Sequence, residues 1–271
     1  IPSLGIVFDP KLISEINSCY EQRGLRVARI LPCTPLQEAM LSSGQSSADA
    51  AYCNVMIFDV RGDVSQLQAC WESMAQRHEI LRTSFFATDD ASFAFAQVIL
   101  HRDGLAWHNY KLGNELRSQI HQTLANLLEA NEPPVYFALA QEGLSTKLLF
   151  CCHHALYDGI AISTLIQEVQ DLYLGYTLPS PTSYDAYLHH MLGRNVREAD
   201  DYWTHLLNGF EPTFFPSLTS KIPDAPGSSA CSRRELGLPL DRTRQACRNM
   251  SVSLLSVIHA AWAKPVSYTH L

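Results

Sequence analysis

Two adjacent histidines precede an aspartate and a glycine in the segment "CCHHALYDG", which runs from Cys151 to Gly159. The segment follows the apolar run "KLLF", so the histidines are expected at the end of a strand. Imidazole can accept a proton near neutral pH because its unperturbed pKa is about 6.5. These residue types could bind a metal ion, supply a catalytic base, or be hydrogen-bonded within the core.

The spacing argues against a metal site. Cys151, Cys152, His153 and His154 are all possible zinc ligands. Consecutive strand residues point alternately to opposite faces, so these four cannot converge tetrahedrally on one ion. We therefore expect no metal site in this segment.

The same alternation predicts different roles for the two histidines. His153 shares a face with Cys151, whereas His154 shares the opposite face with Cys152. One imidazole can then be a hydrogen-bonded core group while the other faces a cavity and acts as a base.

Asp158 and Gly159 are expected to begin the next helix, because "GIAISTLIQEVQDLY" has helical periodicity. Asp158 is the predicted N-cap, where its carboxylate can accept hydrogen bonds from backbone amides or pair with an arginine. Gly159 is expected to let the backbone turn tightly.

The rest of the chain mixes strands and helices, which indicates an α/β or α+β fold. "LPCTPLQEAML" contains a capping box with Thr34, Pro35 and Gln37, and capping alone accounts for these three residues. A hairpin around Gly143 should join the two strands before the histidines. The patterns predict strands over residues 52–60, 79–86, 93–100, 135–142, 147–153 and 232–240, and helices over 35–44, 64–78, 114–131, 159–173, 183–192, 195–210 and 252–264, the last ending at Pro265.

Three segments together resemble one family. "HHALYDG" matches the HHxxxDG signature of the condensation domains of non-ribosomal peptide synthetases, and HxxxD recurs in chloramphenicol-acetyltransferase-like acyltransferases. "RHEILRTSF", Arg77 to Phe85, matches the family's RHExLRTxF motif, and "LPCTPLQEAML" resembles its opening motif in fungal synthetases. "SYDAY" and "YWTHLLNGF" are weaker similarities. The resemblance covers residues 30 to 264, with a "HHALYDG" variant similar to that of siderophore synthetases.

The resemblance implies a chloramphenicol-acetyltransferase-like lobe followed by an incomplete second lobe of the same type. We accordingly expect residues 1–28 to be an upstream linker, residues 29–178 to form the N-terminal condensation lobe, and residues 179–271 to begin a truncated C-terminal lobe. Residues 265–271 continue no earlier pattern, which makes them a candidate non-native tail. The implied reaction is peptide-bond formation between a carrier-bound acyl or peptidyl thioester and an aminoacyl acceptor.

The family's motif also implies site residues. His154 corresponds to the catalytic histidine, which acts as a general base or orients the attacking amine. His153 and Asp158 would support it, and the Gly159 amide would lie near the developing oxyanion. Arg77 and Arg82 would be structural supports, with Arg82 as a partner for Asp158.

The resemblance further implies partners. Donor and acceptor peptidyl carrier domains would each present a phosphopantetheine arm, and an adenylation domain would lie adjacent. The domain itself would bind no cofactor. Epimerisation, terminal cyclisation and ester formation use the same motif and stay open, as does an inactive fragment that only docks carrier proteins.

Composition excludes several other classes of function. The chain has 271 residues, of which 46% are hydrophobic, and 27 acidic against 20 basic residues produce a net charge of −7. This charge offers no electrostatic attraction to nucleic acid or to an anionic membrane. A membrane-spanning helix needs about 18 consecutive apolar residues, and no apolar run in the sequence approaches that length. Eight cysteines without paired spacing suggest reduced thiols and a cytoplasmic protein.

Overall fold

The computed structural model describes residues 8–44, 52–90, 92–102, 104–111, 116–143, 145–210 and 237–269. The chain divides into two compact units, Ile1–Val196 and Arg197–Leu271. The boundary was expected after residue 178, but the helix that follows still packs Leu188 against strands of the first unit.

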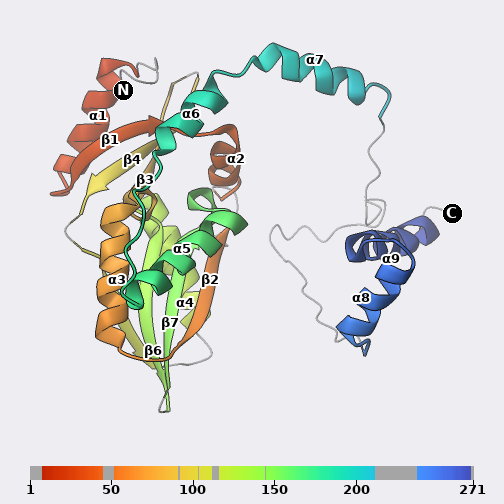
Figure 1. The fold of residues 1–271 in the computed structure, drawn as a ribbon. Coiled ribbons are helices and arrows are strands. Elements are labelled where there is room, and N and C mark those ends of the chain that lie inside the picture. Colours follow the sequence, from red (N-terminus) through yellow and green to blue (C-terminus); the bar gives the residue numbers. More distant parts are fainter. Residues whose placement is uncertain are drawn as a thin grey trace. The chain divides into compact units, whose positions relative to one another are not determined.

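The first unit contains strands and helices that are coloured from red to teal in Figure 1. Its strands are β1 (Arg26–Pro32), β2 (Cys53–Val60), β3 (Thr83–Ala87), β4 (Phe95–His101), β5 (Trp107–Lys111), β6 (Val135–Glu142) and β7 (Ser145–His153). Its helices are α1 (Pro10–Glu21), α2 (Pro35–Gly44), α3 (Val64–Arg77), α4 (Leu116–Glu129), α5 (Gly159–Tyr173) and α6 (Tyr184–Leu192), with the short 3-10 helices η2 (Glu79–Arg82) and η3 (His154–Leu156).

A four-stranded sheet in the order β2-β7-β6-β5 forms the larger part of this unit. β7 is antiparallel to both of its neighbours, whereas β5 and β6 run parallel. Leu148 and Phe150 of β7 share one buried cluster with α3 and α5. Leu149 and Cys151 point to the other face, into a cluster with α4. Figure 1 shows α3 and α5 together on one side of this sheet. Helices therefore cover both faces, and the predicted alternation of β7 is confirmed.

A smaller sheet, β1-β4-β3, carries α1 on one face. Ile16 and Tyr20 of α1 are completely buried against alternate residues of β4. The Tyr20 hydroxyl lies 2.7 Å from the Ser84 hydroxyl, which donates to the Val98 carbonyl. The expectation of a linker is therefore wrong for residues 8–28, because an amphipathic helix and a strand from this region complete the core. Residues 1–7 lie outside the described residues.

The predicted strand over residues 79–86 is only partly correct. Its first half is η2, and β3 begins at Thr83. The Leu81 amide donates to the His78 carbonyl, and the Thr83 hydroxyl donates to the Glu79 carbonyl. In η2 these local hydrogen bonds take the place of hydrogen bonds to a neighbouring strand. Strands β1 and β5 and helix α1 were not predicted from the sequence.

The second unit contains the helices α7 (Val196–Leu206), α8 (Leu240–Asn249) and α9 (Leu254–Thr269). α8 was not predicted, and most of the strand expected over residues 232–240 lies outside the described residues. α9 continues through Pro265, where it was expected to end, since a proline removes one backbone hydrogen bond while the neighbouring bonds persist. None of the described helices combines the length and apolarity that a membrane span requires.

An ion pair joins the two helices that cover one face of the larger sheet. Arg77, the last residue of α3, donates from Nε and Nη2 to the Glu168 carboxylate of α5 at 3.1 and 3.0 Å. His78 also bonds to Glu168. Burial by itself raises the pKa of Glu168, but the hydrogen bonds from Arg77 and His78 outweigh it and lower that pKa.

Substituting Ile16 should show that α1 is an integral part of the fold. Ile16→Ala removes a fully buried side chain and is expected to lower the free energy of unfolding by about 3 kcal/mol. Ile13→Ala is the matched control on the same helix, because Ile13 is 37% exposed. Urea denaturation measures both. Equal effects of the two substitutions would contradict the packing of α1.

Glu168→Gln should destabilise the protein near neutral pH by about 1–2 kcal/mol, because a charge-assisted bond to Arg77 becomes neutral. A carboxylate with a lowered pKa stabilises the fold above its ordinary value of 4.5, and this contribution is lost as the pH falls through the folded-state pKa. The difference from wild type should therefore shrink below pH 4.5. Urea denaturation at neutral and acidic pH tests this, and a difference independent of pH would contradict it.

Candidate active site

The two histidines lie at the junction between β7 and α5, and they have different environments. His153 ends β7 and is 1% exposed. Its Nδ1 accepts a hydrogen bond from the Ala155 amide at 3.2 Å, and the edge of its ring contacts Tyr52. The structure thus confirms His153 as a hydrogen-bonded core residue.

His154 begins η3 and is half-buried at the wall of a pocket. Its amide donates to the Tyr52 carbonyl at 2.8 Å, and its ring stacks on Tyr157 with centroids 4.7 Å apart and planes 10° apart. Within the described part of the chain, its buried Nδ1 has no hydrogen-bond partner. An unsatisfied buried nitrogen costs free energy, and native proteins retain such groups mainly where they serve a function.

Asp158 is the N-cap of α5, as predicted. Its Oδ1 accepts from the amides of Ile160 and Ala161 at 3.0 and 2.7 Å. Arg82 instead donates from Nη1 to the Leu100 carbonyl at 2.8 Å. The predicted pairing of Arg82 with Asp158 is therefore wrong, because backbone amides hold the carboxylate and the guanidinium faces β4.

The backbone of Gly159 also differs from expectation. Its φ is not among the positive values of the described residues, so its backbone does not require glycine. A Cβ at this position would meet nothing within 4 Å, which means that open space adjoins it. The prediction of a glycine-dependent tight turn is wrong. Arg77, expected to be a structural support, forms an ion pair with Glu168 at the end of α3.

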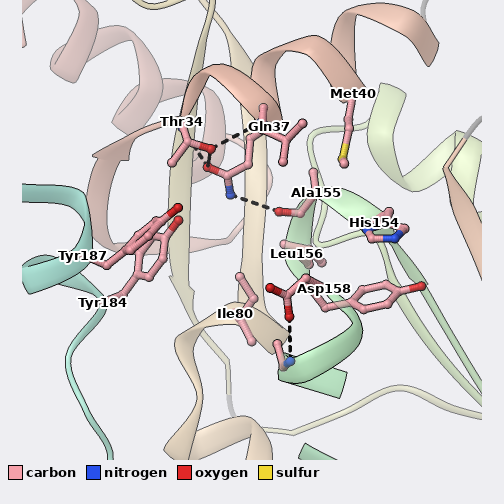
Figure 2. Close-up of a pocket in the computed structure, with 13 residues that line it drawn as sticks. Thr34, Gln37, Met40, Ile80, His154, Ala155, Leu156, Asp158, Tyr184 and Tyr187 are labelled. Carbon is pink, nitrogen blue, oxygen red and sulfur yellow. Dashed lines mark hydrogen bonds between the residues drawn. The ribbon is translucent and has the colours of Figure 1, made fainter. Parts of the chain in front are cut away.

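A pocket of about 350 Å³ lies beside His154, and several elements of the first unit contribute to its wall. Figure 2 shows His154 and Asp158 from the β7–α5 junction, Gln37 and Met40 from α2, and Tyr184 from α6 around it. The lining residues are Thr34, Leu36, Gln37, Met40, Ile80, His154, Ala155, Leu156, Tyr157, Asp158, Ala161, Tyr184 and Tyr187.

Sequence reasoning missed the two tyrosines of α6. Tyr184 and Tyr187 are stacked with ring centroids 5.4 Å apart. Burial, reinforced by Tyr187 and Cys33, raises the pKa of the Tyr184 phenol, which therefore stays protonated at neutral pH and can donate a hydrogen bond. The weak family similarity of "SYDAY" was the available signal for this wall.

Gln37 has a larger role than the capping expected of it. The capping box is present, with the Gln37 amide donating to the Thr34 hydroxyl at 3.3 Å and the Thr34 amide donating to Gln37 Oε1 at 2.9 Å. Gln37 Nε2 also donates to the Ala155 carbonyl at 3.0 Å and to Gln97 Oε1 at 3.1 Å. Interpreting Gln37 by capping alone was therefore wrong, because its bonds to β4 and η3 join segments distant in sequence.

The nearby thiols are poorly suited to nucleophilic chemistry. Burial raises the pKa of Cys33, of Cys152 and, to about 12, of Cys53, so each is held as a thiol. None of the seven cysteines in the described part of the chain forms a disulfide. No group of three or more His, Cys, Asp or Glu side chains among the described residues could hold a metal ion. The pocket thus offers imidazole, phenol and carboxylate groups.

Comparison with known proteins identifies relatives of this arrangement. A family model described as "Condensation domain" matches residues 27–267. Nonribosomal peptide synthetase 2 of Cochliobolus heterostrophus is 56% identical over 265 residues, which are 97% of this chain and 5% of that protein. The hydroxamate-type ferrichrome siderophore peptide synthetase of Schizosaccharomyces pombe is 24% identical over 238 residues, which are 88% of this chain and again 5% of the relative. The chain therefore spans a small part of the length of these relatives.

Solved structures share the fold. The condensation domain from the monacolin K polyketide synthase MokA matches with a TM-score of 0.57 and 17% identity, covering 84% of this chain and 57% of the other. The epimerization domain from the third module of tyrocidine synthetase B matches with a TM-score of 0.53 and 16% identity, covering 68% and 46%. Since the family model spans most of its residues, this chain belongs to the condensation-domain family and has the chloramphenicol-acetyltransferase-like fold.

Proposed function

We propose that the chain is a condensation domain that forms a peptide bond, and that His154 is its catalytic residue. The observation that carries the proposal is the position of the His154 ring, which is half-buried at the wall of the pocket and stacks on Tyr157. The match of the chain to the condensation family supports the reaction type.

The reaction transfers an acyl group to an amine. The amine nitrogen of the acceptor attacks the thioester carbonyl of the donor, the C–S bond breaks, and the donor thiol leaves. His154 orients the amine and takes the proton that the nitrogen loses, then returns it to the leaving thiolate. Stacking on Tyr157 restricts the ring, and the backbone bond from the His154 amide to Tyr52 holds the main chain that carries it, which supports a role that depends on orientation.

The start of α5 would stabilise the negative charge that develops on the carbonyl oxygen. Asp158 occupies the amides of Ile160 and Ala161, whereas the Gly159 amide is not engaged by that carboxylate. The open space beside Gly159 would let a substrate carbonyl approach this amide. His153, Arg77 and Arg82 would act as structural supports through their contacts with the turn, with α5 and with β4.

The substrates would arrive on partner domains. Donor and acceptor peptidyl carrier domains would present phosphopantetheine thioesters to this cytoplasmic domain, and an adjacent adenylation domain would load the acceptor. The match to a synthetase named for a ferrichrome siderophore supports a siderophore peptide as the product. Terminal cyclisation, epimerisation, ester formation and simple carrier docking are the competing functions, and the experiment below separates them.

His154→Ala should lower the condensation rate by about 10²- to 10⁴-fold, because it removes the group that positions the amine and accepts its proton. The assay uses the native full-length protein with loaded donor and acceptor carrier domains, and intact-protein mass spectrometry follows the transfer. Carrier binding should be unchanged in the variant.

His190→Ala is the matched control, because His190 is exposed and lies outside the residues that line the pocket. Full activity of His154→Ala would overturn the mechanism. Carrier binding without transfer in the wild type would indicate docking, and release of a cyclic, epimerised or ester product would indicate one of the other reactions.

Asp158 should act mainly as a helix cap. Asp158→Ala is expected to lower the free energy of unfolding by about 1 kcal/mol, because two amides at the start of α5 lose their acceptor. Asp158→Asn should restore most of this stability, since asparagine caps helices about as well. Thermal unfolding of both variants measures the effect. Equal destabilisation by alanine and asparagine would show that the charge, rather than the cap, is what matters.

A further inference from the structure

The buried side chain of Gln37 connects three segments that are far apart in sequence. Its Oε1 accepts from the amide and the hydroxyl of Thr34 at 2.9 and 3.2 Å. Its Nε2 donates to Gln97 Oε1 at 3.1 Å and to the Ala155 carbonyl at 3.0 Å. Gln97 Nε2 in turn donates to the Pro32 carbonyl at 2.8 Å.

These bonds determine which way the Gln37 amide points. The side chain is 7% exposed, and both its donor hydrogens and both acceptor positions of its oxygen are used. Turning the amide over would place its oxygen against two other oxygens, those of Gln97 and Ala155. The network therefore holds Nε2 toward Ala155 (Figure 2).

Ala155 directly follows His154, and the turn that contains both is held by backbone bonds. The His154 amide donates to the Tyr52 carbonyl at 2.8 Å. The Ala155 amide donates to His153 Nδ1 at 3.2 Å, and the Ala155 carbonyl accepts from Gln37. Because Ala155 is only 6% exposed, its carbonyl would be left largely without a replacement partner if Gln37 lost its donor.

We infer that Gln37 is a positioning residue for His154, an inference that rests on the proposed role of His154. Its bond to the Ala155 carbonyl fixes the peptide between Ala155 and Leu156, one residue beyond His154, and thereby the turn that directs the imidazole toward the pocket. A small displacement of a catalytic group is costly, because reacting groups must lie within a narrow range of distance and angle.

Two substitutions at Gln37 distinguish its bond to the Ala155 carbonyl from its role in the capping box. Gln37→Met keeps the length of the side chain and removes all its hydrogen bonds. Gln37→Glu keeps the acceptor that completes the capping box, but at pH 8 an ionised carboxylate has no donor for the Ala155 carbonyl. Gln97→Met is the matched control. Gln97 is also buried and accepts from Gln37 Nε2, so its substitution removes one of the two acceptors that orient the Gln37 amide and leaves the bond to Ala155 in place.

Both Gln37 variants should lower the single-turnover condensation rate on the order of 10- to 100-fold at saturating carrier protein. Gln97→Met should lower the rate less than either Gln37 substitution, although thermal unfolding should show that substitutions at both sites destabilise the protein. The measurement uses the native full-length protein at a temperature where all variants are folded.

A second readout does not depend on activity. The rate at which diethyl pyrocarbonate modifies His154, mapped by mass spectrometry without substrates, should change in both Gln37 variants and change less in Gln97→Met. An unchanged modification rate in a folded Gln37 variant would overturn the positioning role. So would equal loss of turnover at positions 37 and 97. A wild type that fails to condense would instead refute the proposed function, while the modification rates would still report on His154.

Discussion

The alternation of side chains along β7 is the constraint on which the rest of this structure depends. β7 is hydrogen-bonded along both edges and covered by helices on both faces, so each of its side chains must pack into one of two apolar clusters. Leu148 and Phe150 pack toward α3 and α5, whereas Leu149 and Cys151 pack toward α4. The two histidines at the end of β7 likewise have different environments. His153 is buried in the core, and His154 lies at the wall of the pocket.

The surrounding elements stabilise that strand end. Asp158 caps α5, Glu168 ties α5 to the end of α3, and Gln37 joins α2 and β4 to the turn that carries His154. The interactions of Glu168 and Gln37 satisfy buried or partly buried polar groups, which would be costly to leave unpaired. These interactions hold the segments that adjoin the residue carrying the candidate catalytic ring.

The family match and the fold match carry different amounts of information about chemistry. Solved condensation and epimerization domains resemble this chain to similar degrees, so the backbone alone does not distinguish their reactions. The chemical argument comes from the pocket. Buried thiols with raised pKa values are poor nucleophiles, whereas an imidazole at the wall of the pocket is a residue type suited to positioning and proton transfer.

Local sequence determined the parts of this protein that depend on neighbouring residues. The capping box at Thr34, the cap at Asp158, the length of α5 and the different environments of His153 and His154 were all expected from short-range rules. Only tertiary structure decided the partners of Gln37 and Arg82, the place of α1 in the core and the tyrosine wall from α6. Those features depend on which distant segment lies opposite, a relation that periodicity and spacing do not encode.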